Sequence, residues 1–311
     1  MVEPILKAQA ADGGIPENIT LVDSSADHVL MGDMVPDALR RVGSSMERAF
    51  QLLKDGEADA FMSAGNSAAV VAFAHRVLRY LPGITSPAII IQLPTKRAGK
   101  RCLLLDAGGI TGCTPQLLVS WLRMAKVMAE ILLEVENPVI SLHNIGSEED
   151  KGNELVKKTY RLAKASAGLR SVKLVEPRDY FGGTVDAVIC DGFTGNTILK
   201  VAEAVAELLL HWIREAFGSS FFAKLVGAMA RPYLKSVKTR LDPNQHGGAI
   251  LAGINGVTVI AHGSASEVGV ANAILFAAEA ARQELHLKIG AALAPAENGG
   301  GADGDESTGT A

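Results

Sequence analysis

One pattern recurs five times along the chain: a short apolar run ends at a turn rich in Gly, Asn, Ser or Asp, and a helical pattern often follows. The five instances are "ADAFMSAGNSAA" (58–69), "CLLLDAGGITG" (102–112), "PVISLHNIGSEEDKGNE" (138–154), "DAVICDGFTGN" (186–196) and "GVTVIAHGSAS" (256–266). Strands that alternate with helices indicate an α/β fold with a largely parallel sheet sandwiched by helices. We expect the carboxyl ends of these strands, where the turns gather, to form the ligand side of the sheet.

A hairpin and two long helices complete the expected architecture. The run "PAIIIQLPT" (87–95) ends at Pro94 and predicts a strand that forms a hairpin with 101–105. Thr114 and Pro115 are typical of an N-cap followed by the first helical residue, and a second long helix is predicted over 198–216. Each helix keeps its polar residues in one narrow stripe, so we expect the sheet and a second subunit to cover the rest.

Composition and charge limit the classes of partner. The chain has 311 residues, 48% of them hydrophobic, which is enough to bury a large core. Of its 34 acidic residues, four lie in 291–311, which has no Lys or Arg, so the rest of the chain balances 30 acidic against 30 basic residues. This balance gives no indication of nucleic-acid binding. Three cysteines without metal-ligand spacing, and no run long enough to span a bilayer, predict a cytoplasmic protein without a metal site.

The domain organisation follows from the same composition. We expect one α/β domain over 1–285, with a basic helical insertion at 214–240 that protrudes from it. The last residues, 286–311, are acidic and rich in Gly, and we expect them to form a disordered tail because they lack apolar groups to bury.

The turn between Asp191 and Asn196 is a candidate binding site. Backbone N–H groups at a helix start favour anions, and Gly192 and Gly195 would let a phosphate approach closely. Asp191 is itself negative, so it would repel a phosphate unless it is neutralised or serves in acid–base chemistry. The alternative is a helix cap or Asx turn with no ligand.

Two earlier strand ends offer further candidates. In "SAGNSAA" the hydrogen-bonding residues are Ser63 and Asn66, with Gly65 between them, and capping explains such residues equally well. In "LLLDAGGITG" the candidates are Asp106 and Gly108. The glycine spacing there differs from G-x-G-x-x-G, so a dinucleotide fingerprint is not supported.

Two later strand ends add charged and titratable groups. "GSEEDKGNE" brings Lys151 and Asn153 directly before a helix, where a cation could neutralise an anionic substrate; the alternative is a solvated charged loop. "IAHGSAS" ends a strand with a histidine, followed by a glycine and a serine: His262, Gly263 and Ser264. Such a histidine is either a structural hydrogen-bonding group or a functional one.

The segment 214–240 carries a different signal. It holds six basic residues against Glu215 alone, a local charge of +5, with aromatic and aliphatic residues between them. This composition is typical of a surface for anionic lipid or for an acidic partner protein, and equally of a helical hairpin that packs in a dimer. The residues expected to dock are Phe221, Phe222, Lys224, Arg231, Lys235, Lys238 and Arg240.

The order of these motifs resembles the bacterial phosphate acyltransferase family of the PlsX type. The matching stretches are "PDALRRVGSSMERAFQLLKDGEADAFMSAGNSAA", "LLLDAGG", "NPVISLHNIGSEEDKGNELVKKTYRLAK", "EPRDYFGGTVDAVICDGFTGNTILK" and "HGGAILAGINGVTVIAHGSAS". Together the matching stretches cover roughly residues 20–285. The family usually begins with a strand that ends in "DAMGGD"; this chain has no equivalent, so we expect that first strand to be absent.

The resemblance implies a fold, a reaction and partners. The fold would be related to phosphate acetyltransferases and to isocitrate and isopropylmalate dehydrogenases. The reaction would be acyl-acyl carrier protein plus inorganic phosphate giving acyl phosphate plus free carrier, without a cofactor. The product would feed phospholipid synthesis through a membrane-bound glycerol-3-phosphate acyltransferase. The family also implies a homodimer that associates peripherally with the membrane.

This chemistry suggests roles for the candidate residues. A thiol with a pKa of about 8.5 is a good leaving group, so the site chiefly needs to position the reactants and stabilise charge. We expect Lys151 and the N–H groups of 63–67 and 192–196 to hold the phosphate and the oxyanion, and His262 or Asp191 to move the proton. The orienting donors would be Asn66, Asn153 and Asn196. Two alternatives are an enzyme that uses coenzyme A and an impaired relative that only binds carrier protein or membrane.

Overall fold

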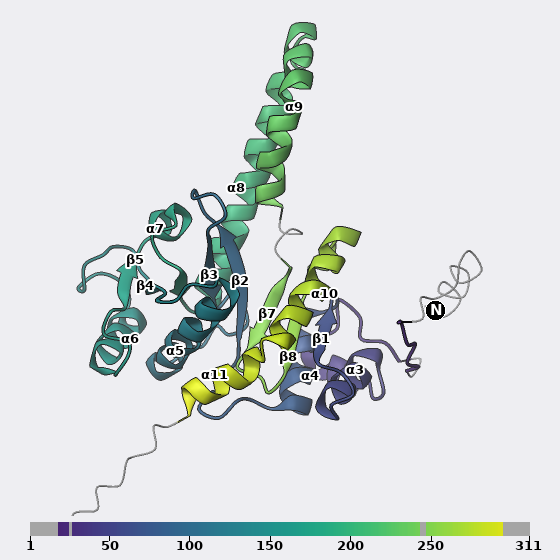
Figure 1. Cartoon of the computed structure of the whole chain (residues 1–311), viewed down its shortest axis with the longest axis vertical. Helices are drawn as coiled ribbons and strands as arrows, with labels where there is room; N and C mark the ends of the chain where they lie inside the picture. Colours follow the sequence, from purple (N-terminus) through teal and green to yellow (C-terminus); the bar gives the residue numbers. More distant parts are fainter. Residues whose placement is uncertain (1–17, 25–26, 243–246, 295–311) are drawn as a thin grey trace, which may run out of the picture.

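The computed structural model describes residues 18–24, 27–242 and 247–294. In this part of the chain one eight-stranded sheet crosses the molecule, with helices on both of its faces (Figure 1). The strands lie in the order β1-β8-β7-β2-β3-β6-β4-β5. Their bounds are β1 Ala60–Ser63, β2 Ala88–Pro94, β3 Arg101–Leu105, β4 Ile140–His143, β5 Lys173–Val175, β6 Ala187–Ile189, β7 Ala249–Ala252 and β8 Val257–Ile260.

The helices confirm the predicted alternation. The bounds are α2 Val35–Arg40, α3 Ser45–Lys54, α4 Ser67–Leu78, α5 Pro115–Leu132, α6 Glu154–Ala165, α7 Pro177–Gly182, α8 Gly192–Gly218, α9 Phe221–Leu241, α10 Glu267–Arg282 and α11 Leu285–Leu293. All five predicted units of strand, turn and helix are present, as is the antiparallel hairpin of β2 and β3. Thr114 caps α5 as expected, because its hydroxyl accepts a hydrogen bond from the Leu117 N–H at 3.2 Å.

The sheet contains two parallel groups that run in opposite directions. β1 and β8 form one group, and β3, β6, β4 and β5 form the other. Between them the pairs β8–β7, β7–β2 and β2–β3 are all antiparallel, and three successive reversals leave the two groups opposed. The prediction that all five turns gather at one edge of the sheet was therefore wrong. The turns after β1 and β8 lie at the opposite edge from those after β3, β4 and β6.

The largest hydrophobic cluster joins α5, α10 and α11 to the sheet. Trp121 of α5 is fully buried there, and its indole N–H donates to the Ser86 carbonyl at 3.1 Å. Leu285, Ile289 and Leu293 bury one face of α11 in the same cluster. The domain boundary predicted at residue 285 was therefore too early, because an apolar residue at every fourth position continues the fold by one helix. The rest of the predicted tail, from residue 295, lies outside the described residues.

α8 begins directly after Asp191, several residues before the predicted start at 198. Asp191 is its N-cap: one carboxylate oxygen accepts from the Thr194 N–H at 3.0 Å and the other from the Thr194 hydroxyl at 2.7 Å. The sequence concealed this start because glycine and threonine are poor helix formers. A Cβ atom on Gly195 would lie 1.9 Å from the Asp106 carbonyl oxygen, so glycine lets α8 contact the end of β3.

α8 and α9 pack side by side as a hairpin that projects from the body of the molecule (Figure 1). Gly227 of α9 lies against the Phe217 ring of α8, where a Cβ atom would come within 2.9 Å of the Phe217 side chain. The predicted protruding helical segment is thus present, although it begins within α8 rather than at residue 214.

We predict that Gly195→Ala destabilises the fold by about 3 kcal/mol, because the added methyl group would collide with backbone rather than with a side chain that could turn away. The matched control is Gly218→Ala at the other end of α8, where a Cβ atom has no neighbour within 4 Å. Urea unfolding of the two variants and the wild type measures the difference. Equal free energies of unfolding for the two variants would contradict the contact.

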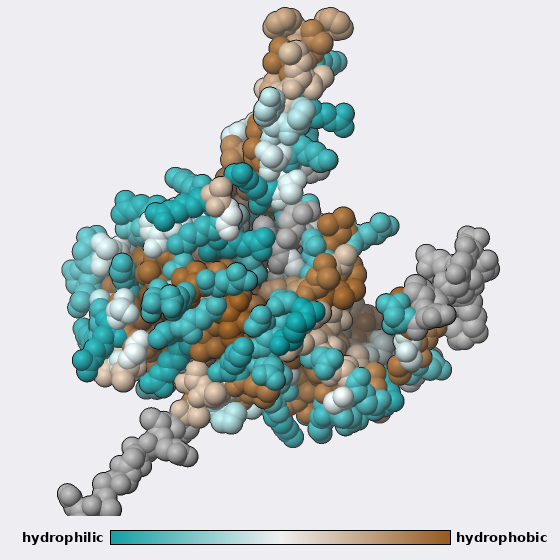
Figure 2. Space-filling view, in the orientation of Figure 1, coloured by the Kyte–Doolittle hydropathy of each residue, from teal (hydrophilic) through white to brown (hydrophobic). Residues whose placement is uncertain are grey.

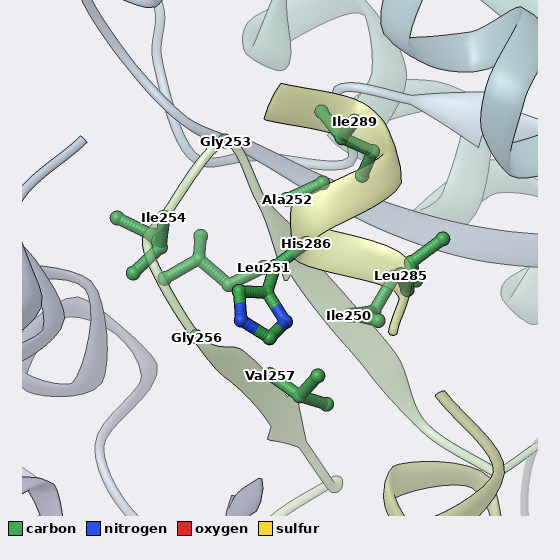
Figure 3. Close-up of a pocket in the computed structure, with 10 residues that line it drawn as sticks. All are labelled: Ile250, Leu251, Ala252, Gly253, Ile254, Gly256, Val257, Leu285, His286 and Ile289. Atoms are coloured by element: carbon green, nitrogen blue, oxygen red, sulfur yellow. The ribbon is translucent and has the colours of Figure 1, made fainter. Parts of the chain in front are cut away.

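α11 also closes a small cavity of about 10 Å³, enough for roughly one water molecule (Figure 3). The imidazole of His286 lies beside the loop from Gly253 to Gly256 in this cavity. Its Nδ1 atom is buried, and none of the described residues forms a hydrogen bond with it. Burial lowers the pKa of His286, because the charged imidazolium would lose its hydration there.

The lowered pKa predicts a loss of stability in acid. A histidine whose pKa is lower in the folded than in the unfolded state stabilises the fold fully above about pH 6.5 and progressively less as the pH falls below that value. We expect the free energy of unfolding of the wild type to fall relative to that of His286→Leu between pH 7.5 and 5.5, by at most about 1.4 kcal/mol per pH unit. Urea unfolding at each pH tests this, and parallel pH curves for the two proteins would reject it.

Candidate functional site

A cleft of about 1070 Å³ lies against β2, between α8 and the loop that joins β8 to α10. Ile89, Ile91 and Leu93 of β2 form its floor, because alternate residues of a strand share one face. α8 forms one wall with residues three or four positions apart, which share one side of a helix. Its lining residues on α8 are Asn196, Leu199, Lys200, Ala202, Glu203, Ala206, Glu207 and Leu210. The cleft has the size of a small-molecule site.

Residues from both parallel groups of the sheet meet in this cleft. Gly108, after β3, and Asn196, in the first turns of α8, come from one group; a Cβ atom on Gly108 would lie 3.3 Å from the Cβ of Asn196. His262 and Ser264, after β8, come from the other group. The cleft therefore unites two turns that belong to opposite edges of the sheet.

His262 has a defined tautomer in this loop. The backbone N–H of Ser264 donates to His262 Nδ1 at 3.2 Å, and the Ser264 hydroxyl lies 2.7 Å from the same nitrogen. Because a backbone N–H can only donate, Nδ1 must be an acceptor and the neutral ring carries its proton on Nε2. His262 is exposed, so Nε2 can act as a hydrogen-bond donor to a ligand.

Asp106 holds the loop after β3, which lines the cleft, in place through hydrogen bonds. Its buried carboxylate accepts hydrogen bonds from four backbone N–H groups, those of Ile89, Gly108, Gly109 and Ile110, at 2.7 to 3.3 Å. Burial raises the pKa of the Asp106 carboxyl, and these four donors act in the opposite direction. Both oxygens are thus used in shaping the loop that presents Gly108. The predicted contact of Asp106 with a substrate stays a prediction.

The turn after β1 is also held by its own side chains. Asn66 is buried; its amide donates to the carbonyls of Leu30, Met31 and Asp33, and its carbonyl oxygen caps α4 by accepting from the Ala69 N–H. The Ser63 hydroxyl accepts from the Gly65 N–H at 3.0 Å.

These bonds fit the capping alternative, and they present the next residue, Ser67, to the cleft. Gly263, in the turn after β8, lies close to Met31: a Cβ atom on this glycine would come within 2.9 Å of the Met31 side chain.

The turn after β4 does not line the cleft. Lys151 is half exposed and its ammonium group pairs with Glu148 at 2.8 Å, which raises the Lys151 pKa. Asn153 caps α6 by accepting from the Val156 N–H at 2.9 Å. The loop is fastened by the buried Asn144, whose amide donates to the carbonyls of Gly146 and Lys151. The predicted roles of Lys151 and Asn153 stay predictions.

Asp191 has a neighbour that the sequence did not reveal. β4 and β6 are paired in register with Leu142 opposite Ile189, so His143, the last residue of β4, lies close to Asp191, which follows the end of the adjacent strand β6 by two residues. Burial lowers the pKa of His143, and the negative charge of Asp191 opposes that shift. Gly192 packs against Asp106 and the Ile110 carbonyl, which accepts the Gly192 N–H at 2.8 Å.

The cleft also contains cations that the sequence did not single out. Lys96, after β2, and Lys200 of α8 both line it. Lys200 follows Asn196 by four residues, a spacing that places both on one side of a helix, and this was the available signal. Its ammonium group pairs with Glu203 at 2.8 Å.

The residues predicted to dock lie on α9, and none of those whose side chains the structure describes lines the cleft, although Arg240 directly precedes the lining residues Leu241 and Asp242. Phe221 and Phe222 begin the helix at the far end of the hairpin, with 88% and 73% of their surfaces exposed. Lys224, Arg231 and Lys235 are exposed and spaced by seven and four residues, so they share one side of α9. Arg240 is also exposed, and the side chain of Lys238 lies outside the described part of the structure.

Two properties concern metals and membranes. In residues 18–24, 27–242 and 247–294, no three His, Cys, Asp or Glu side chains form a group that could hold a metal ion. Among the helices of these same ranges, none combines the length and the apolar character that crossing a bilayer requires.

The fold is similar to that of solved phosphotransacetylases. The phosphotransacetylase from Streptococcus pyogenes aligns with a TM-score of 0.59 and 15% identity, over 91% of this chain and 84% of its own. The EutD phosphotransacetylase from Staphylococcus aureus aligns with a TM-score of 0.57 and 13% identity, over 90% and 84%. The expected relation to phosphate acetyltransferases is confirmed at the level of fold.

Sequence relatives are closer. The phosphate acyltransferase of Thermodesulfovibrio yellowstonii is 37% identical over 89% of this chain and 79% of its own, and that of Thermus thermophilus is 42% identical over 80% and 76%. The model of a family described as fatty acid synthesis protein matches residues 4–288. The chain therefore belongs to the fatty acid synthesis protein family, together with these phosphate acyltransferases, and is an acyltransferase.

Proposed function

We propose that the protein transfers a fatty acyl group from acyl carrier protein to inorganic phosphate and releases acyl phosphate for phospholipid synthesis. The names of the relatives and of the family support the acyl transfer and the lipid context. The observation that carries the proposal is the cleft, where Gly108 and Asn196 face the same space as His262 and Ser264. The same cleft also exposes apolar side chains of β2 and α8, such as Ile91 and Leu199, which a fatty acyl substrate could contact.

The reaction needs little acid–base assistance. A phosphate oxygen attacks the thioester carbonyl carbon, a C–O bond forms, and the tetrahedral intermediate collapses as the C–S bond breaks. The sulfur leaves with the bonding electron pair and takes up the proton that the phosphate gives up. Because thiols have a pKa of about 8.5, the thiolate leaves readily near neutral pH. Orientation and stabilisation of the oxyanion then account for most of the work of the site.

The phosphate would bind on the side of the cleft formed by α4 and α10. Both helices begin there, since Ser67 is the first residue of α4 and Gly269 lies in the first turn of α10. Their N-caps, Asn66 and Ser266, are neutral. The first turn of α4 has no acidic residue, so the positive end of its dipole is available to an anion, whereas α10 carries Glu267 in its first turn. α8 differs, because its N-cap is the negative Asp191. His262 Nε2–H and the Asn196 amide would then hold the phosphate and the oxyanion from opposite sides.

Assembly and location are further parts of the proposal. One side of α8 exposes a row of apolar residues to solvent, namely Val201, Val205, Leu208, Leu209 and Trp212. Such a row on a projecting helix supports a homodimer in which a second copy covers it. The three cysteines are free, which supports a cytoplasmic location.

The end of the hairpin supports peripheral attachment to a membrane, where a membrane-bound acyltransferase would consume the product. Apolar side chains gather at this end (Figure 2), which carries Phe221 and Phe222. Leu225, Met229 and Tyr233 continue this surface at four-residue intervals, and α9 contains no acidic residue. Apolar and basic residues on one helix are typical of binding to anionic lipid.

We predict that the purified chain forms acyl phosphate from acyl carrier protein and phosphate, and that His262→Ala lowers kcat/KM roughly a hundredfold through loss of a donor to the reacting groups. The matched control is His211→Ala, since His211 is exposed on α8 and does not line the cleft. The appearance of acyl hydroxamate after hydroxylamine quenching measures product.

Three outcomes of this assay would change the proposal. No product from any acyl donor would reject it, and faster turnover of acyl coenzyme A than of acyl carrier protein would reject the carrier as donor. Equal effects of His262→Ala and His211→Ala would remove His262 from the site. Lys151→Ala is measured alongside, and unchanged turnover would exclude Lys151.

We also predict that the wild type sediments with anionic vesicles and that Lys224/Arg231/Lys235→Glu does not, because each basic residue near such a surface is worth about 1 kcal/mol. Lys157/Lys158/Arg161→Glu on α6 makes the same change of charge elsewhere and should still sediment. Equal sedimentation of the wild type and the α9 variant would reject lipid docking. A higher KM of that variant for acyl carrier protein would then assign the basic residues to the carrier.

A further inference from the structure

The two parts of the cleft differ in chemistry. Near Asn196 and His262 it is lined by polar groups and by the starts of helices. Farther along α8 the lining includes the aliphatic residues Leu199, Ala202, Ala206 and Leu210, with the apolar residues of β2 as the floor and Leu241 at the end of α9. Charged residues of α8, namely Lys200, Glu203 and Glu207, lie between these aliphatic positions. A ligand that fits this space is polar at one end and has a long apolar chain at the other.

The length of the apolar part can be estimated from the helix. From Asn196 to Leu210, both of which line the cleft, α8 advances 14 residues, or about 21 Å at 1.5 Å per residue. An extended polypeptide advances 3.3–3.6 Å over three backbone bonds, so an extended carbon chain advances about 1.2 Å per bond. A 16-carbon acyl chain therefore spans about 18 Å, which matches the cleft.

Two alanines give this part of the cleft its width. Ala202 and Ala206 are the small residues on the side of α8 that lines the cleft. The apolar residues on the solvent side of the same stretch are larger, as Val205 and Leu208 show. These small side chains leave room between α8 and the floor of β2 for an acyl chain to lie along the helix. The distance of each alanine from the polar end of the cleft follows from its position in α8.

We propose that the acyl chain lies along α8 with its carbonyl near Asn196 and its methyl end toward Leu210, and that Ala202 and Ala206 determine which chain lengths are accepted. This inference rests on the proposed function, because it assigns the donor's chain to a place in the same cleft. Ala202 lies six residues beyond Asn196, or about 9 Å, and Ala206 lies ten residues beyond, or about 15 Å. These distances correspond to about 8 and about 13 carbons.

The test uses Ala202→Phe and Ala206→Phe, with Ala204→Phe as the matched control. Ala204 is exposed, lies on another side of α8 and does not line the cleft. Turnover of acyl carrier protein loaded with 8-, 12- and 16-carbon chains is measured for each protein. We expect the ratio of kcat/KM for 16 carbons to that for 8 carbons to fall at least tenfold in Ala206→Phe, while in Ala204→Phe it stays at the wild-type value. In Ala202→Phe we expect kcat/KM for the 12-carbon donor to fall as well, because Ala202 lies closer to the polar end of the cleft.

The outcomes separate this inference from the proposed function. A wild type that acylates phosphate from no donor rejects the proposed function itself. An active wild type whose length ratios are unchanged in both cleft variants overturns the inference and leaves the function intact, and an equal shift in Ala204→Phe overturns it too. Circular dichroism confirms folding, and Ala206→Met provides a smaller substitution for the same ratio should Ala206→Phe not fold.

Discussion

The carboxylate of Asp106 is the interaction on which the rest of the site depends. It gathers four backbone N–H groups at the end of β3, and one of them, that of Ile89, belongs to β2. α8 packs directly against this loop, because Gly192 and Gly195 have no side chain that would separate the helix from Asp106. Removing this carboxylate would leave four buried donors without their acceptor, so the floor and one wall of the cleft are held by one residue.

The cleft itself results from the reversal of strand direction within the sheet. Had all strands been parallel, every turn would lie at one edge, and the crevice outside that edge would be the expected site. Here β7 and β2 separate two opposed groups, so the site extends across β2 from the turn after β3 to the turn after β8. Residues far apart in the sequence, such as Gly108 and His262, become neighbours of one cavity through this arrangement.

Local features of the sequence could be predicted, and features that depend on strand order could not. The strand–helix units, the cap at Thr114 and the β2–β3 hairpin follow from nearby residues and were correct. The start of α8 was misplaced because local helix propensity is low at Gly192 and Gly195. Glycine is required at these two positions by the close contact with Asp106, which only the folded structure reveals. The residues next to His143 in the sequence do not indicate that its strand, β4, pairs with the strand that precedes Asp191. Likewise, Lys96 lines the cleft because β2 runs antiparallel to its neighbours, and strand direction could not be predicted from nearby residues.

α8 is one unbroken helix from Gly192 to Gly218, about 40 Å long at 1.5 Å per residue. It borders the cleft from Asn196 to Leu210, and its last turn reaches the far end of the hairpin. A single unbroken helix therefore fixes the distance between the far end of the hairpin and the cleft. In the proposed attachment to a membrane, the hairpin would therefore be a spacer as well as a contact, and it would hold the cleft at a constant height above the lipid surface.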